Sequence, residues 1–168
     1  LIANTSWYIY NFRSNLIKDI VSSNYKLVVI APHDNYTNLL EKSGYTVINW
    51  TLNRSSLNPL SELKSIVDLV LILNKENPDL IHNFTIKSCL YATIASRFSK
   101  VRYVINSITG LGHLFLNNST LIRFIRFILK PIYALVFNTK NSFLIFQNIE
   151  DQKYLFEIGI IKNLNKSF

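Results

Sequence analysis

The feature that most constrains the fold is an alternation of short apolar runs with longer amphipathic runs along the whole chain. The short runs have the length of strands, and Lys26–Ala31 (KLVVIA) is continuous, as in a strand buried on both faces. The longer runs, such as Pro59–Asn77, repeat apolar residues at helical spacing. This alternation is typical of βαβ units. The sequence therefore predicts an α/β fold built on a Rossmann-like doubly wound parallel sheet.

Five or six strands are predicted, with the first visible only as a short run; the ranges are Leu1–Ala3, Lys26–Ala31, Tyr45–Trp50, Asp79–Asn83, Val101–Ile108 and Phe143–Phe146. The predicted helices are Tyr10–Ser23, Tyr36–Lys42, Pro59–Asn77, Ile86–Phe98, Ser119–Asn138 and Glu150–Ile158. Pro131 should kink or break the helix that contains it. Residues 1–168 fit one domain of ordinary size.

Charge and motifs limit the classes of partner. The net charge of +8 favours an anionic partner, which could be nucleic acid, an acidic bilayer or a phosphorylated substrate. Nucleic acid fits least well, because the positive charge is concentrated on an apolar helix. No Gly-x-Gly-x-x-Gly follows a strand and no Walker lysine loop is present, which argues against a classical NAD or P-loop enzyme. The single cysteine, Cys89, excludes a cysteine-cage metal site and is expected to be a buried free thiol.

Polar residues follow the first and fourth predicted strands, where ligands bind in doubly wound sheets. Asn4–Trp7 could cap the next helix or hold an anion at its N-terminus. His82, Asn83, Thr85 and Lys87 bring an imidazole, an amide, a hydroxyl and an ammonium together. Lys87 beside a helix N-terminus could help to hold a phosphate. A structural hydrogen bond is the alternative role for His82.

The fifth predicted strand leads into the segment Thr109-Gly110-Leu111-Gly112-His113. Two of the four glycines of the chain lie here, two residues apart. Glycine permits positive φ and a close approach of the backbone to a ligand. A tight strand-to-helix turn is the alternative explanation, although one glycine usually suffices for it.

The predicted helix Ser119–Asn138 is apolar over most of its circumference, apart from a narrow stripe formed by Arg123, Arg126 and Lys130. Its apolar run is shorter than the roughly 20 residues that a membrane span needs. A helix lying in the membrane interface, with basic side chains reaching anionic headgroups, fits the pattern better. The alternative is a core helix with a solvated basic stripe whose remaining surface is covered by another domain.

At these loops the sequence resembles glycosyltransferase family 4, in the N-terminal domain of its GT-B enzymes. The resemblance is greatest to the bacterial subgroup that adds sugars to undecaprenyl-diphosphate-linked acceptors. The segments that carry it are NTSWYIYNFR from Asn4, VVIAPHDNY from Val28, PDLIHNFTIK from Pro78, INSITGLGHLF from Ile105 and FQNIEDQKYLFEIGII from Phe146.

The resemblance implies an acceptor held by Asn4, Ser6, His82, Asn83, Thr85, Lys87, Gly110 and Gly112. Thr109 stands where many relatives have a histidine, and His113 lies further along the same loop. The resemblance makes these two residues the candidates for a catalytic role. Arg123, Arg126 and Lys130 would contact the membrane.

The implied enzyme transfers a hexose or N-acetylhexosamine from a nucleotide sugar to a polyprenyl-diphosphate-linked or other glycan acceptor. It needs no metal or cofactor and works at the cytoplasmic, inner face of the plasma membrane. The nucleotide sugar would bind mainly to a C-terminal domain outside this chain, so this part alone is expected to be inactive. Two alternatives remain: a non-catalytic membrane-docking subunit or truncated remnant, and half of a sugar-nucleotide epimerase with the same architecture.

Overall fold

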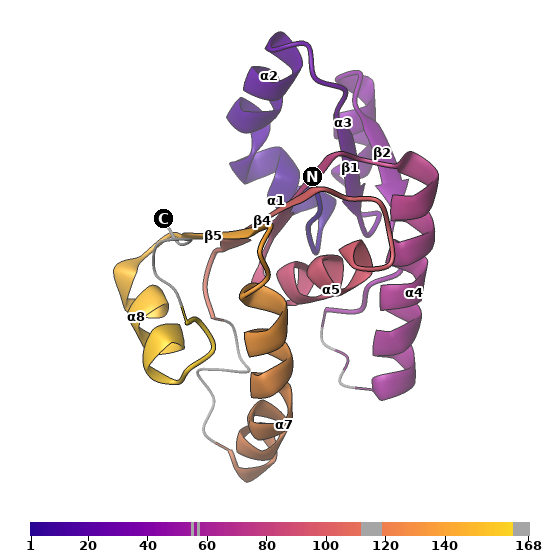
Figure 1. The fold of residues 1–168 in the computed structure, drawn as a ribbon. Helices are drawn as coiled ribbons and strands as arrows, with labels where there is room; N and C mark the ends of the chain where they lie inside the picture. The colour runs from indigo at the N-terminus through magenta and orange to yellow at the C-terminus, as the bar shows by residue number, and fades with distance from the viewer. Residues whose placement is uncertain (55, 57, 112–118, 163–168) are drawn as a thin grey trace.

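The computed structural model describes residues 1–54, 56, 58–111 and 119–162. Five strands are present: β1 (Val28–Ala31), β2 (Thr46–Asn49), β3 (Leu80–Phe84), β4 (Tyr103–Ile108) and β5 (Ser142–Phe146). Every pair of neighbours among them is parallel, with β1 beside β2 and β3–β4–β5 in that order. The strands are short and connected through helices, as the alternating sequence pattern predicts (Figure 1).

The first three residues join the two groups of strands into one sheet. Ile2 forms parallel bridges to Ile30 of β1 and Asn83 of β3. The Ile2 N–H donates to the His82 carbonyl at 2.9 Å, and the Ala3 N–H donates to the Ile30 carbonyl at 3.1 Å. If residues 1–3 count as the first strand, the order across the sheet is 3-2-1-4-5-6. This is the Rossmann order, so the predicted fold class is confirmed.

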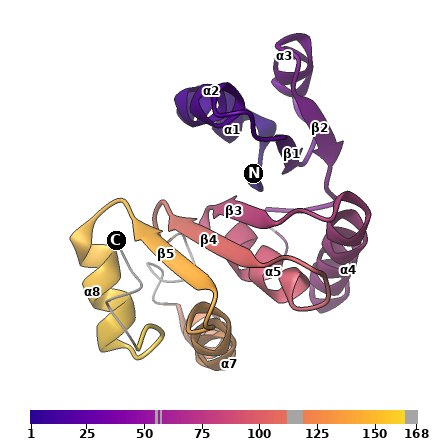
Figure 2. The ribbon, with the colours of Figure 1, turned by 45° about the horizontal axis from the view of Figure 1, so that its top comes forward.

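The helices lie in layers on the two faces of the sheet. Figure 2 shows α1 (Ser6–Phe12), α2 (Ser14–Ser22) and α3 (Thr37–Lys42) on one side. The other side carries α4 (Pro59–Glu76), α5 (Ile86–Ser96), α7 (Thr120–Phe137) and α8 (Ile149–Glu157).

Each layer has its own apolar core, because side chains alternate between the faces along each strand. The smaller core joins Val29, Ala31 and Phe84 to residues of α1–α3. The larger core joins Ile30 and Ile81, among others, to residues of α4, α5, α7 and α8.

Two details of the helices differ from the sequence predictions. The predicted helix Tyr10–Ser23 is two helices, and the first begins earlier because the Thr5 hydroxyl caps the Tyr8 N–H at 3.1 Å. The break lies at Arg13, whose φ of −126° is not helical. Pro131 was expected to kink or break its helix, and it does not break it, because α7 continues through it. Pro131 is exposed, so water can hydrate the carbonyl that its ring leaves without an N–H donor.

Candidate functional site

The carboxyl edge of the sheet collects polar residues from three loops. Asn4–Ser6 follows the first extended stretch, Thr85 follows β3, and Thr109 with Gly110 follows β4. Because all these strands are parallel, the loops that follow them emerge at the same edge. The structure therefore brings Asn4, Thr85 and Thr109 to one side of the domain.

The Asn4–Trp7 loop is tied to the loop after β1. The buried Ser6 hydroxyl donates to the Pro32 carbonyl at 3.2 Å and accepts from the Thr37 hydroxyl at 2.9 Å. The Trp7 N–H at the start of α1 donates to an Asp34 carboxylate oxygen at 2.9 Å. The donors of this helix terminus thus bind protein oxygens, while Asn4 lies half-buried at the edge.

His82 faces the α1 layer, whereas the adjacent Asn83 faces the α5 layer. His82 Nε2 lies 2.7 Å from the Ser107 hydroxyl, and its ring stacks on Phe84 with centroids 4.3 Å apart. Burial, followed by nearby positive charge that includes Arg13, lowers the pKa of His82 to about 4. The imidazole is therefore neutral at pH 7 and has a structural hydrogen-bond partner.

Asn83 belongs to a buried polar network beneath α5. Its amide nitrogen donates to the Asn106 amide oxygen at 2.8 Å. The Asn106 amide nitrogen donates to the hydroxyls of Thr93 at 2.9 Å and Ser142 at 3.2 Å. The network links β3, β4, β5 and α5 in the core, so Asn83 stabilises the strands that carry the carboxyl edge.

Cys89 lies beside this network and is fully buried. Its Sγ approaches the Asn83 carbonyl at 3.5 Å, and burial raises the pKa of the thiol. The expected buried free thiol is confirmed, and the protonated sulfur has no access to a ligand at the edge.

Thr85 has an unusual backbone conformation between β3 and α5. Its φ is +70°, a region that a β-branched residue rarely adopts. Its hydroxyl lies 3.3 Å from the Ser88 hydroxyl, and its side chain makes no capping bond to the first turn of α5. Strained residues of this kind are concentrated at functional sites.

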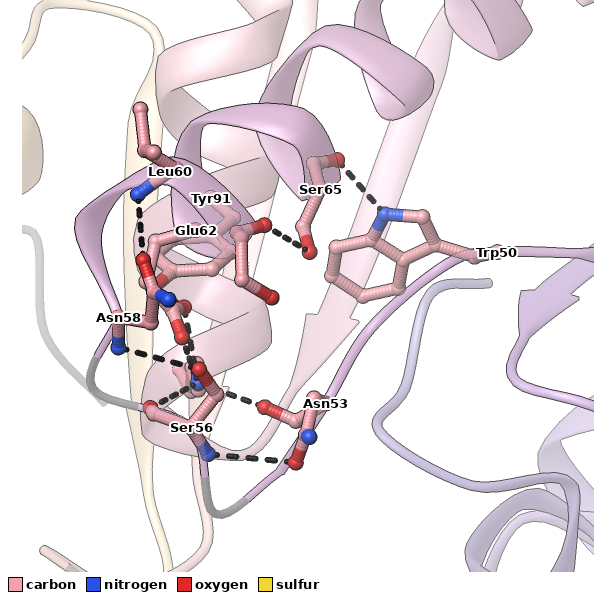
Figure 3. Close-up of polar contacts among 10 residues, drawn as sticks. Trp50, Asn53, Ser56, Asn58, Leu60, Glu62, Ser65 and Tyr91 are labelled. Atoms are coloured by element: carbon pink, nitrogen blue, oxygen red, sulfur yellow. Dashed lines mark hydrogen bonds and ion pairs between the residues drawn. The ribbon is translucent and has the colours of Figure 1, made fainter.

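Lys87 is fixed by a polar network, whose residues Asn53, Ser56, Glu62 and Tyr91 are labelled in Figure 3. Its ammonium donates to the carbonyls of Asn53 at 2.8 Å and Ser56 at 3.0 Å, and to the Glu62 carboxylate at 3.0 Å. The Tyr91 hydroxyl donates to the other Glu62 oxygen. An ammonium has three N–H donors, so all three are used within the protein. Lys87 therefore fastens the segment after β2 to α4 and α5.

The same segment is held at two further points (Figure 3). The Trp50 indole N–H donates to the Ser65 carbonyl at 2.9 Å inside the core. Asn58 caps α4 by accepting the Leu60 N–H at 3.0 Å. These two contacts hold Trp50 and Asn58 to α4, while Lys87 binds Asn53 and Ser56 to α5.

The loop after β4 has open space at Gly110. Gly110 has a φ of +131°, and a Cβ added there would meet nothing within 4 Å. Only glycine adopts this conformation readily, as the sequence analysis expected. Thr109 is half-buried beside it. Gly112 and His113 lie outside the described residues.

Some residues of this region carried no signal in the sequence. Glu62 is an ordinary acid in the first turn of a helix, and its partner Lys87 lies far along the chain. Arg13 places its guanidinium 4.7 Å from the centre of the Phe84 ring, and its positive charge helps to lower the pKa of His82. Only the folded sheet shows that these side chains meet.

Helix α7 has a buried face and an exposed apolar face. Ile122, Tyr133, Val136 and Phe137 face the core. The opposite arc is exposed and consists of Phe124, Phe127, Ile128, Ile132 and Leu135, which we call the outer arc. Phe127 is 76% exposed and Leu135 is 65% exposed. Arg123 and Lys130 are exposed beside the outer arc, and Arg126 is half-buried.

The remaining features concern membranes and metals. No described helix is long and apolar enough to cross a bilayer. Within residues 1–54, 56, 58–111 and 119–162, histidine, cysteine, aspartate and glutamate side chains do not gather in groups of three that could hold a metal ion.

Comparisons with known proteins agree with this architecture. The chain is 30% identical over 155 residues to N,N'-diacetylbacillosaminyl-diphospho-undecaprenol alpha-1,3-N-acetylgalactosaminyltransferase of Campylobacter jejuni, which covers 92% of this chain and 41% of that protein. A glycosyltransferase structure from Rickettsia africae superposes with a TM-score of 0.70 at 15% identity, covering 99% of this chain and 41% of the other. A UDP-GlcNAc 2-epimerase from Methanocaldococcus jannaschii gives 0.64 at 18% identity, covering 99% and 44%.

The two structural likenesses show the fold, which a transferase and an epimerase share. The chain spans less than half the length of each of these relatives. Residues 1–148 match the family described as glycosyl transferase 4-like, which is most of the chain. The chain therefore belongs to the glycosyl transferase 4-like family.

Proposed function

We propose that this chain is the acceptor-binding half of a glycosyltransferase that moves a sugar from a nucleotide sugar to a lipid-diphosphate-linked glycan. The observation that carries the proposal is the 30% identity to the Campylobacter transferase, whose name specifies a diphospho-undecaprenol acceptor. That identity extends over 92% of this chain, and the family match over residues 1–148 includes the loops at the carboxyl edge. The transferred group is a hexose or N-acetylhexosamine. The donor binds mainly to a second domain, which residues 1–168 do not include, so this half alone is inactive.

The acceptor in this proposal lies along the edge formed by Asn4, Thr85 and Thr109. Gly110 leaves room beside Thr109 for the reacting sugar, because its surroundings are open within 4 Å. The strained Thr85 sets the direction of the first turn of α5, whose N–H groups favour an anion such as a diphosphate. His113 and Gly112 belong to the same loop in sequence and complete the proposed reaction site.

Three other predicted residues have a structural role in this proposal and hold the carboxyl edge in position. Ser6 and His82 are hydrogen-bonded to neighbouring loops and strands, and they keep the edge in place. Lys87 acts through the segment that it holds, since its ammonium already has three acceptors. Lys87→Ala should therefore weaken the use of the acceptor far more than the use of the donor.

Docking at the membrane is the second part of the proposal. The outer arc of α7 lies opposite the core-facing side of the helix, with Arg123 and Lys130 beside it. A helix with this distribution lies in the membrane interface, its apolar residues among the acyl chains and its basic residues at anionic headgroups. The protein would thus be peripheral at the inner face of the plasma membrane, where it reaches a lipid-linked acceptor.

A transfer assay tests the activity. The full-length enzyme is incubated with a labelled UDP-N-acetylhexosamine, with and without a polyprenyl-diphosphate-linked glycan, and both the lipid and the nucleotide sugar are analysed. Label in the lipid only when the acceptor is present supports the proposal. Epimerised nucleotide sugar without any acceptor would instead identify an epimerase. The absence of both products, with membrane binding retained, would indicate a non-catalytic docking subunit.

Vesicle flotation tests the docking surface. The double variant Phe124→Ser/Phe127→Ser should lose most of its binding to vesicles that contain phosphatidylglycerol, because both rings leave the outer arc. Tyr25→Ser/Phe156→Ser is the matched control, since these rings are also exposed but lie on other elements. Equal binding by the two double variants would contradict docking through α7.

A further inference from the structure

An exposed tryptophan lies at the proposed acceptor edge and has no role in the function described above. Trp7 is the second residue of α1, directly after the loop of residues 4–6, and it is 43% exposed. The other tryptophan of the chain, Trp50, is 1% exposed, and its indole N–H is bonded inside the core. Ligand sites are commonly lined by aromatic side chains, so an exposed indole at this edge favours a binding role.

Three contacts hold Trp7 in place. Its backbone N–H donates to an Asp34 carboxylate oxygen at 2.9 Å, and its carbonyl accepts from the Asn11 amide at 2.9 Å. The indole packs edge-on against the Phe12 ring, with centroids 5.3 Å apart and an angle of 78° between the planes. A side chain that is already fixed loses little conformational entropy when a ligand docks on it. Trp7 is therefore suited to act as a rigid platform.

A series of aromatic rings leads from Trp7 to the end of β3. The Phe12 ring contacts Tyr8 with centroids 5.4 Å apart, and Tyr8 contacts Phe84 at 5.8 Å. Phe84 is the last residue of β3, and Thr85 of the proposed acceptor edge follows it directly. The series therefore connects Trp7 to the part of the edge that Thr85 forms.

A polar side chain with unused hydrogen-bonding groups belongs to the loop that precedes Trp7. Asn4 is half-buried, and within the part of the chain that the structure describes its amide has no hydrogen-bond partner. An amide offers two N–H donors and an acceptor oxygen, which match the hydroxyl groups of a sugar. A pyranose carries hydroxyls around its rim and C–H groups on its faces. The amide and the indole together match both kinds of surface.

We propose that the Trp7 indole stacks on the C–H face of a sugar ring of the acceptor, while Asn4 binds hydroxyls on the rim of that ring. The inference rests on the proposed function and adds a specificity-determining residue to the acceptor edge. A sugar fits this place better than the polyprenyl chain, because a hydrocarbon would bury the Asn4 amide without a hydrogen-bond partner. An indole accepts only a ring face rich in C–H groups, so Trp7 selects among acceptor sugars by their configuration.

Acceptor kinetics of the full-length enzyme test the platform. Trp7→Ala should raise the acceptor KM roughly tenfold, as truncation of an important aromatic contact does, and should leave the donor KM within about twofold. Trp7→Phe keeps a flat ring and should stay within about threefold of the original acceptor KM. Trp7→Leu keeps apolar surface without a ring, so it should behave like Trp7→Ala.

The matched control is Tyr25→Ala, which should leave the acceptor KM unchanged. Tyr25 is 70% exposed, but it lies between α2 and β1, at the amino edge of the sheet. Equal acceptor KM values for Trp7→Ala and Tyr25→Ala would overturn the proposal. Full rescue by Trp7→Leu would also overturn it, because a residue that only covers apolar surface needs no ring.

A change of acceptor identifies which part of it lies on the ring. The kinetics are measured with a diphosphate-linked N-acetylhexosamine that carries either a polyprenyl chain or a short alkyl chain. If the sugar stacks on Trp7, the loss in Trp7→Ala is the same with both acceptors. A loss that appears only with the polyprenyl chain would make the lipid the ligand and would overturn the proposal.

Tryptophan fluorescence separates failure of this inference from failure of the proposed function. The full-length enzyme and its Trp7→Phe variant are titrated with the short-chain N-acetylhexosamine diphosphate, and the difference in emission reports on Trp7. An enzyme that transfers sugar without any effect of Trp7 on emission or on KM keeps its function and loses the platform. A change in Trp7 emission in an enzyme that transfers no sugar would support the platform and overturn the transferase.

Discussion

Lys87 of α5 and Glu62 of α4 form an ion pair with 2.9 Å between Nζ and Oε2, and the Tyr91 hydroxyl binds the same carboxylate. Glu62→Ala should lower the free energy of unfolding by ~1–3 kcal/mol, because an ammonium and a hydroxyl lose their acceptor. The two side chains keep 22% and 17% exposure, so water replaces part of the loss. Urea denaturation measures the change, with the exposed Glu41→Ala as the control. An equal effect of the two substitutions would contradict the role given to Glu62.

A double-mutant cycle over Lys87 and Glu62 tests whether the pair acts as a unit. The combined variant Lys87→Ala/Glu62→Ala should be more stable than the sum of the single losses predicts, because each single variant leaves an unpaired charge. A coupling energy of about 0.5–3 kcal/mol is expected for residues in one network. Strict additivity in urea denaturation would show that the two side chains act independently.

The stability of the protein should fall on acidification partly because of His82. The folded-state pKa of about 4 lies below the ordinary value of 6.5, so the unfolded chain binds more protons between these values. The free energy of unfolding therefore rises with pH in this window, and His82 contributes fully above pH 6.5. The shift corresponds to a loss on the order of 2–3 kcal/mol as the pH falls toward 4.

Comparison of variants isolates this contribution from the titration of the carboxylates. His82→Gln should show a smaller difference in stability between pH 7 and pH 4.5 than the original protein does. The matched control is His33→Gln, since His33 is exposed. Urea denaturation at both pH values gives the four free energies required. An unchanged pH dependence in His82→Gln would show that the imidazole is not buried in its neutral form.

Thr85→Gly should stabilise the fold by about 1 kcal/mol or leave it unchanged, although glycine usually destabilises. A φ of +70° costs a β-branched residue on the order of 1–3 kcal/mol, which glycine avoids, while glycine adds entropy to the unfolded chain. Thermal denaturation measures the effect. Asn77→Gly is the control, because asparagine tolerates its φ of +45°. A clear destabilisation by Thr85→Gly alone would show that the Thr85 hydroxyl stabilises the fold by more than the backbone strain destabilises it.

The buried amide network should respond unequally to the loss of its two asparagines. Asn106→Ala removes hydrogen bonds to Asn83, Thr93 and Ser142, and it should cost about 2–4 kcal/mol. Asn83→Ala should cost less, because the Asn83 amide oxygen is buried without a partner among the described residues. Chemical denaturation of the two variants gives the order. A larger loss of stability for Asn83→Ala than for Asn106→Ala would mean that the Asn83 amide oxygen has a stabilising hydrogen-bond partner.

The pattern of apolar runs predicted the α/β class and the doubly wound parallel sheet, because the rules for parallel sheets leave few ways to connect alternating strands and helices. The ends of helices were hardest to predict where a side-chain cap determines the first helical residue. Thr5 caps α1 and moves its start to Ser6, which the apolar spacing from Tyr10 could not show. Apolar spacing likewise predicted that α7 has more apolar surface than one core can cover, and the exposed outer arc confirms it.

The candidate site was predictable only as a set of loops. Parallel topology brings Asn4, Thr85 and Thr109 to one edge, and this follows from the sequence. Alternation along β3 separates His82 from Asn83, although they are adjacent in sequence and looked like members of one cluster. The partners of Lys87 come from α4 and the preceding segment, so its involvement in an internal network depends on tertiary packing that no local pattern contains.

The three-residue stretch Leu1–Ala3 is the only direct strand contact between the two halves of the described sheet. Without this stretch, no described strand of the β1–β2 pair is hydrogen-bonded to a strand of the β3–β4–β5 group. Folding of the two halves is therefore coupled through pairings between residues distant in sequence, which form slowly. A proteolytic cut that displaced this stretch would separate the two halves of the carboxyl edge. Because Ile2 lies in the larger core and Ala3 in the smaller one, both apolar cores would lose a buried residue at the same time.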